Sequence, residues 1–191
     1  KVDELLNKKA DKRKTDYFPP TLEGALKLES GLNMAVISVP GKYAYEVARS
    51  CLEHEINVML FSDNVTMEEE KDLKEFAASR ELLVMGPDCG TAIVNNTPLA
   101  FANVVKSGDI GMVCASGTGA QEVSCIIDQL GCGISQLLGT GGRDLKQEIG
   151  GIMMRLGLDA LIHDPKTKVI TLVSKPPAPE IAAKILDQAA A

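Results

Sequence analysis

The stretch NMAVISVPGKYAYEVARSCLEHEINVMLFS, residues 33–62, decides the fold class. It begins and ends with short apolar runs typical of buried strands, and the segment between them places apolar residues at helical spacing. A strand, a helix and a second strand in this order predict a parallel sheet with a right-handed crossover. Because ligands bind such sheets beyond the carboxyl ends of the strands, we expect functional residues in the loops that follow strands.

The same alternation continues beyond this unit. Residues 66–80 form the next predicted helix, where Thr66 and Glu69 have the spacing of a capping box, and a short strand follows at 82–86. Residues 87–109 interrupt the rhythm with prolines, glycines and asparagines, which favours a junction between two modules. The pattern then restarts, with strands predicted at 109–115, 133–139 and 168–174 and helices at 119–131, 145–159 and 178–190.

The sequence therefore predicts an α/β fold with two parallel-sheet modules. We expect a charged lead-in over residues 1–20, a first module over 21–105 and a second over 106–191. The charged runs EEE (68–70) and KDLKEF (71–76) are interpreted as the solvated surface of a helix. The sequence does not start with Met, and we expect it to be a piece of a longer protein.

Composition excludes several classes of partner. The 191 residues carry a formal net charge of −6 with a pI near 5.0, which leaves no basic surface for nucleic acid or an anionic membrane. No apolar run approaches the roughly 18 residues of a membrane-spanning helix, and the first residues lack the apolar core of a signal peptide. We expect a cytoplasmic protein whose partners are small molecules, a partner subunit or further copies of itself.

The cysteines and histidines do not suggest a metal site. The five cysteines are odd in number and lack C-x-x-C spacing, so we interpret them as reduced packing residues. His54 and His163 have no His or Cys neighbour at ligand spacing, and we interpret both as structural. The sequence thus predicts no bound metal.

The most informative loop is the Ser116 turn, Ser116–Gly119, within VCASGTGAQE (113–122). A glycine-rich link from strand to helix leaves backbone N–H groups free at a helix N-terminus, where a phosphate or carboxylate is favoured. Alternatively, Thr118 and Gln121 form a capping box that satisfies these groups without a ligand. The turn lacks the ending of a P-loop, the third glycine of a dinucleotide-binding loop and the glycine pattern of a nucleophile elbow.

Two basic residues are expected on the same edge of the sheet as the Ser116 turn. Lys175 follows the strand at 168–174, and Arg143 lies in the loop GTGGRD, 139–144, after another predicted strand. Because the carboxyl ends of parallel strands share one edge, we expect both residues to form a basic pocket with the Ser116 turn. Such a pocket would hold an acidic group of a substrate or partner.

Six motifs in order resemble those of a known superfamily. They are NVMLFSDNVT, LLVMGPDCGT, TPLAFANV, ASGTG, GGRDL and SKPPA. Together they resemble the α subunit of succinyl-CoA synthetase and the related NDP-forming acyl-CoA synthetases, and most closely the FdrA-like proteins, over about residues 30–190. This resemblance implies a partial Rossmann-like CoA-binding domain followed by a flavodoxin-like ligase domain, matching the two predicted modules.

The resemblance also implies roles for particular loops. The residues implied for coenzyme A are Pro40, Ser62, Asp63 and Asp88, the last of which replaces the usual asparagine. Ser116, Gly117 and Thr118 match the start of a helix that faces a phosphorylated histidine in the synthetases, and Gly119 completes the predicted anion site. The implied ligands are therefore coenzyme A and a phosphate or phosphoryl group.

Departures from the family pattern leave the reaction open. The glycine-rich loop for the CoA phosphates has no counterpart before residue 33, the phosphohistidine loop has none after the last helix, and Lys175 stands where the family has an acidic residue. We expect part of an acyl-CoA synthetase that is inactive as this chain alone. The alternatives are a carbamoyltransferase component acting on oxamate in purine or allantoin catabolism, and a non-catalytic subunit that binds a metabolite or a partner chain.

Overall fold

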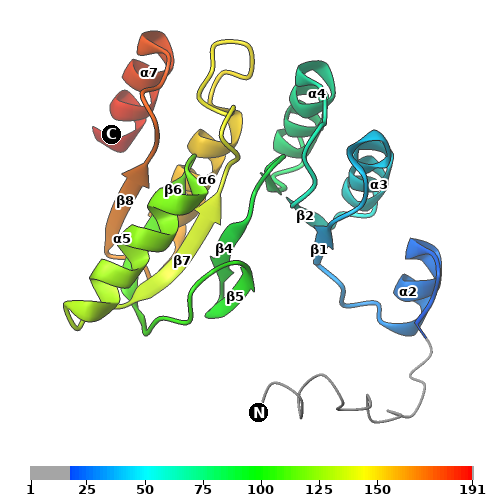
Figure 1. Cartoon of the computed structure of the whole chain (residues 1–191), viewed down its shortest axis with the longest axis horizontal. Helices are drawn as coiled ribbons and strands as arrows, with labels where there is room; N and C mark the ends of the chain where they lie inside the picture. The colour runs from blue at the N-terminus through cyan, green and yellow to red at the C-terminus, as the bar shows by residue number, and fades with distance from the viewer. Residues whose placement is uncertain (1–17, 191) are drawn as a thin grey trace, which may run out of the picture. The chain divides into compact units, whose positions relative to one another are not determined.

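The computed structural model describes residues 18–190, of which 18–32 belong to one unit and 33–190 to another (Figure 1). In the first unit, helix α2 (Leu22–Leu28) begins after Thr21, whose side chain accepts a hydrogen bond from the Gly24 N–H at 3.1 Å. Most of the predicted charged lead-in, residues 1–17, lies outside the described residues. Within residues 18–190, the structure has no helix that is long and apolar enough to cross a bilayer.

The second unit contains two sheets. The first has the order β1-β2-β3, is parallel throughout, and consists of β1 (Met34–Ile37), β2 (Asn57–Leu60) and β3 (Val84–Met85). Its connecting helices are α3 (Gly41–Glu53) and α4 (Met67–Ala78). The capping box predicted for α4 is confirmed, because Thr66 and Glu69 exchange side-chain to backbone hydrogen bonds.

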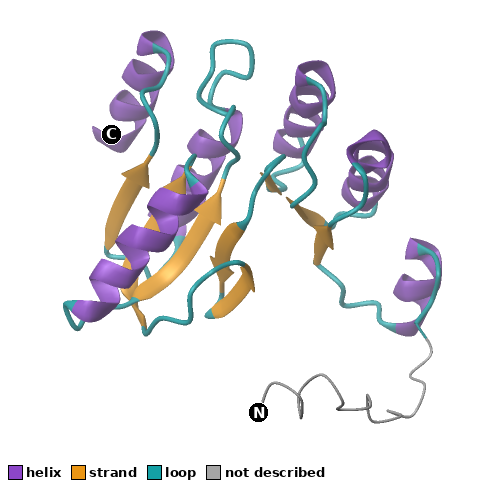
Figure 2. Cartoon of the chain, viewed as in Figure 1, coloured by secondary structure: helices purple, strands orange, loops and turns teal. Residues whose placement is uncertain are grey.

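The second sheet has the order β5-β4-β7-β6-β8 (Figure 2). Its strands are β4 (Thr91–Val94), β5 (Thr97–Ala100), β6 (Ser107–Cys114), β7 (Ile134–Gly139) and β8 (Val169–Val173), and its helices are α5 (Gly117–Gln129), α6 (Ile152–His163) and α7 (Pro179–Ala190). Strands β6, β7 and β8 are parallel and end level with one another, because Cys114 pairs with both Gly139 and Val173.

The structure adds one local feature to the predicted pattern and corrects another. An antiparallel hairpin, β4–β5, forms within the segment predicted as a junction, and its turn residues Asn95 and Asn96 have φ of 48° and 64°. Asparagine tolerates this left-handed backbone, which makes a tight hairpin turn possible. The junction between two modules stays a prediction. The helix predicted at 145–159 begins only at Ile152, because Gly150 and Gly151 adopt φ of 83° and 69° and interrupt it.

Two apolar clusters lie on the two faces of the second sheet. On one face, residues of α6 and α7 pack with β6 and β7, and the same cluster includes Met59 and Met85 of the first sheet. On the other face, Ala120 of α5 packs against Met112 and Leu137. Figure 1 shows α5 lying across the strands of this sheet. The shared cluster brings the loops that follow the strands of both sheets into one region.

Candidate functional site

A cavity of about 710 Å³ lies where loops of both sheets meet. Every residue that the sequence implicates in ligand binding lines it, except Gly119 and Arg143. The lining residues among them are Pro40, Ser62, Asp63, Asp88, Ser116, Gly117, Thr118 and Lys175. Each of them follows the carboxyl end of a strand, as expected for ligand contacts in a parallel sheet.

The loops after β1 and β2 are joined through Ser62. This residue is 6% exposed, and its Oγ donates a hydrogen bond to the Val39 carbonyl at 2.6 Å. Asp63 follows with its Oδ1 accepting a hydrogen bond from the Asn64 side chain at 2.7 Å, and it is exposed to solvent. Ser62 therefore fixes the wall of the cavity, while Asp63 leaves a carboxylate accessible within it.

The turn after β3 presents Asp88 in a left-handed conformation. Its φ is +55°, and its backbone N–H donates to the Ser62 carbonyl at 3.1 Å. The neighbouring Cys89 N–H donates to the Leu60 carbonyl at 3.2 Å. Two backbone hydrogen bonds thus hold this turn against the end of β2.

The N-terminus of α5 is capped by Ser116. Its Oγ accepts a hydrogen bond from the Gly119 N–H at 3.3 Å. The alternative capping box does not form, because the Gln121 side chain donates to Thr91 Oγ1 at 3.1 Å and to the Phe101 carbonyl at 3.0 Å. Within residues 18–190, no hydrogen-bond acceptor is assigned to the N–H groups of Gly117 and Thr118, which both line the cavity.

The two predicted basic residues are placed differently. Lys175 lies just beyond β8 and lines the cavity. The Arg143 guanidinium instead forms an ion pair with Glu70 at 2.7 Å and donates to the Val65 carbonyl at 2.9 Å. Among the described residues, Lys175 is therefore the only lysine or arginine that lines the cavity. Asp63 and Asp88 line the same cavity.

A smaller cavity of about 350 Å³ adjoins the first one. The two cavities share Ala115, Gly142 and Lys175. The smaller one extends between residues 145–148 and the segment 176–178. Lys175 thus stands at the boundary between two spaces that a ligand could occupy together.

Two aromatic residues of the cavity are absent from the sequence-based predictions. Phe61 and Phe101 contact each other edge to face, with ring centroids 5.3 Å apart and planes inclined by 70°. Phe101 lies in TPLAFANV, one of the motifs that carry the family resemblance. Its position in the predicted junction, however, did not indicate that it would line a cavity. Phe101 is 66% exposed and available for contact with a ligand.

Cys89 and Cys114 also line the cavity, and both are buried. Burial raises the pKa of the Cys114 thiol to about 12, and the nearby Cys89 acts in the same direction. Burial likewise raises the pKa of Cys89 above its ordinary value. Both thiols are therefore neutral at physiological pH and add no negative charge to the site.

Alkylation should distinguish these thiols from an exposed one. At pH 8 we expect iodoacetamide to modify the exposed Cys132 first, and Cys89 and Cys114 at least about tenfold more slowly, since the thiolate is the reactive form. Mass spectrometry of timed samples would give the three rates. Equal rates at Cys114 and Cys132 would contradict the burial and the raised pKa described above.

Comparison with known proteins shows which families the chain is similar to. The family described as "CoA binding domain" matches residues 105–191. The "Uncharacterized protein YahF" of Escherichia coli (strain K12) is 50% identical over 190 residues, covering 100% of this chain and 37% of YahF. The alpha subunit of succinate–CoA ligase (ADP-forming) from Methanothermobacter thermautotrophicus is 24% identical over 165 residues, covering 84% of this chain and 55% of that subunit.

The chain is thus similar to the CoA binding domain family and to a succinyl-CoA ligase α subunit. Another match is subunit SqwL of ADP-forming sulfoacetate-CoA ligase from Acholeplasma sp, which is 24% identical over 162 residues, covering 81% of this chain and 53% of SqwL. The chain therefore spans only about a third to a half of these relatives. The CoA binding match falls on the predicted ligase module, so the assignment of roles to the two modules stays a prediction.

Solved structures agree on the fold. The dinucleotide-forming acetyl-coenzyme A synthetase 1 of Ca. Korarchaeum cryptofilum, in complex with phosphate and ADP, superposes with a TM-score of 0.70 at 21% identity, covering 96% of this chain and 39% of that one. ATP citrate lyase from Methanothrix soehngenii, in complex with citrate and coenzyme A, gives 0.64 at 19% identity, covering 80% and 26%. The predicted α/β fold class with a parallel-sheet, Rossmann-like domain is confirmed.

Proposed function

We propose that the cavity binds coenzyme A together with an anionic group of a substrate, as part of an FdrA-like acyl-CoA synthetase. One observation carries this proposal: loops far apart in the sequence, after β1, β2, β3, β6 and β8, contribute the residues implied for coenzyme A and most of those implied for the anion to a single cavity. The CoA binding match to residues 105–191 supports the same ligand.

The Ser116 turn and Lys175 form the proposed anion site. The N–H groups of Gly117 and Thr118 stand at the positive end of the α5 dipole, and Lys175 follows the neighbouring strand β8. A phosphoryl or carboxylate oxygen in this region would accept hydrogen bonds from the helix N-terminus and interact with an ammonium group. Phe61 and Phe101 offer ring faces and edges to the flat parts of a larger ligand such as a nucleotide base.

In this proposal, the complete reaction requires residues beyond those of this chain. His54 and His163 each place Nδ1 within 2.9 Å of a main-chain carbonyl of their own helix, and neither lines the cavity. A phosphohistidine would therefore have to come from another segment or subunit. The relatives named above are CoA ligases where their names state an activity, and none is named as a carbamoyltransferase, so the comparisons do not favour that alternative.

Calorimetric titration with coenzyme A, and separately with inorganic phosphate, tests the proposal. We expect weak, saturable binding of both, and Lys175→Ala should weaken it by up to about fivefold, because an exposed ion pair contributes about 1 kcal/mol or less. Lys166→Ala is the matched control, since Lys166 lies before β8, at the opposite end from Lys175. Absence of binding for both ligands would overturn the proposal, and an equal loss in the control would show a non-specific effect of charge.

A further inference from the structure

Helix α4 buries two charged residues in a stretch that the sequence predicts to be solvated. Glu70 is 1% exposed and Lys74 is fully buried, so the expectation of a charged outer surface is wrong at these two positions. They form an ion pair of 2.8 Å one helical turn apart. Burying two charges is costly unless every hydrogen-bonding group is satisfied, so the remaining partners of this pair are informative.

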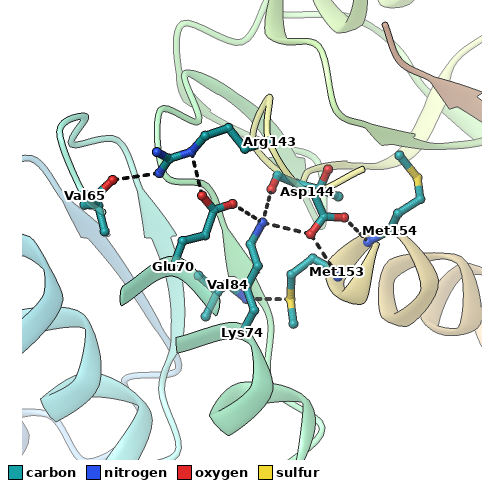
Figure 3. A network of polar contacts seen from close by, with 9 residues as sticks. Val65, Glu70, Lys74, Val84, Arg143, Asp144, Met153 and Met154 are labelled. Carbon is teal, nitrogen blue, oxygen red and sulfur yellow. Dashed lines mark hydrogen bonds and ion pairs between the residues drawn. The ribbon is translucent and has the colours of Figure 1, made fainter. Parts of the chain in front are cut away.

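Lys74 uses all three of its N–H groups, and two of them reach outside α4. Its Nζ donates to Glu70 Oε1 at 2.8 Å, to the Thr140 carbonyl at 2.9 Å and to Asp144 Oδ1 at 2.8 Å (Figure 3). Thr140 and Asp144 belong to the loop 139–144 that follows β7. A lysine of the first sheet's helix thus binds a loop of the second sheet at two points.

The same loop is held by three further contacts. Asp144 accepts hydrogen bonds from the backbone N–H groups of Met153 at 3.3 Å and Met154 at 2.8 Å, in the first turn of α6 (Figure 3). Arg143 pairs with Glu70 Oε2 at 2.7 Å. Glu70, Lys74, Arg143 and Asp144 together form the Lys74 network, whose two positive and two negative charges balance.

The loop that the network holds is a wall of the proposed ligand cavity. Gly139, Gly141 and Gly142 line that cavity, whereas no member of the Lys74 network does. On its other side the loop lies against the turn that carries Asp88, since a Cβ on Gly141 would come within 2.7 Å of the Pro87 carbonyl oxygen. Contacts on both sides therefore fix where the loop stands relative to the ligand.

We propose that Lys74 and Glu70 are positioning residues, which set the affinity of the cavity for its ligand by holding the loop 139–144 in place. This inference rests on the proposed function of the cavity. It assigns a role in ligand binding to two residues that cannot touch the ligand. Without the network, the glycine-rich loop would sample other conformations and the wall beside Lys175 would be poorly defined.

The double variant Glu70→Gln, Lys74→Met tests this role. It removes one charge of each sign from α4, leaves the sequence of the loop intact and keeps the hydrogen bonds that Asp144 accepts from α6. We expect hydrogen exchange at the amides of residues 140–146 to become faster and the affinity for coenzyme A to fall about tenfold, a loss typical when groups that orient a binding site are removed. Both measurements are made at a temperature where parent and variant are fully folded.

Lys71→Met is the matched control, because Lys71 forms an i,i+4 ion pair with Glu75 on the same helix but is half exposed. It should change neither exchange nor affinity. Unchanged exchange in the double variant, or faster exchange with unchanged affinity, would overturn the positioning role while leaving the proposed function in place. Failure of the parent chain to bind coenzyme A and phosphate would overturn both.

Discussion

Lys74→Met alone should lower the free energy of unfolding by about 3–5 kcal/mol, because it leaves the buried carboxylates of Glu70 and Asp144 without their shared cation. Methionine has nearly the volume of lysine, so the loss comes from uncompensated charge rather than from a void. Asp144 keeps two backbone N–H donors from α6, and Glu70 keeps Arg143. These remaining contacts place the expected loss within the range for breaking a buried ion pair.

Urea unfolding of the parent, Lys74→Met and the double variant Glu70→Gln, Lys74→Met would measure this effect. The double variant should recover part of the lost stability, because it removes a negative charge along with the positive one. Lys71→Met should stay within about 0.5 kcal/mol of the parent, as is usual for surface substitutions. A single variant that is as stable as the parent would show that Lys74 is not buried between the two carboxylates.

The sequence predicted which loops line the cavity because the apolar pattern of the strands determines which residues lie at one edge of the sheet. Apolar runs identify parallel strands, and the residues that follow parallel strands share one edge of a sheet. Pro40, Ser62, Asp88 and Lys175 line one cavity for this reason, although they come from widely separated loops. The roles assigned to these residues in binding coenzyme A or an anion remain predictions.

The same rule does not determine the direction of a side chain. Arg143 follows the end of β7 as expected, but Glu70 holds its guanidinium away from the cavity. Lys74 contacts Thr140 and Asp144, which are 66 and 70 positions away in the sequence, and a run of Glu and Lys on a helix gives no indication of such partners. Contacts at this separation depend on how the two sheets pack, which the local pattern does not contain.

Gly86→Ala is the second substitution for which we expect a large effect, a loss of at least about 2 kcal/mol in the free energy of unfolding. Gly86 has φ of +122°, a conformation that residues with a side chain rarely adopt. A Cβ there would also clash with the backbone carbonyl oxygen of Leu60. That carbonyl accepts the Cys89 N–H at 3.2 Å, so it cannot move away without breaking the turn.

Gly142→Ala is the matched control for stability, because a Cβ at Gly142 meets no atom within 4 Å and its backbone is not left-handed. Thermal and urea unfolding should leave the control close to the parent and shift Gly86→Ala clearly downward. The turn that begins at Gly86 also presents Asp88 and contacts the loop 139–144. A Gly86→Ala variant that still folds should therefore bind coenzyme A more weakly than the parent. Parent-like stability and binding in this variant would show that Leu60 does not confine the backbone at Gly86 and that the proposed site does not depend on a rigid turn there.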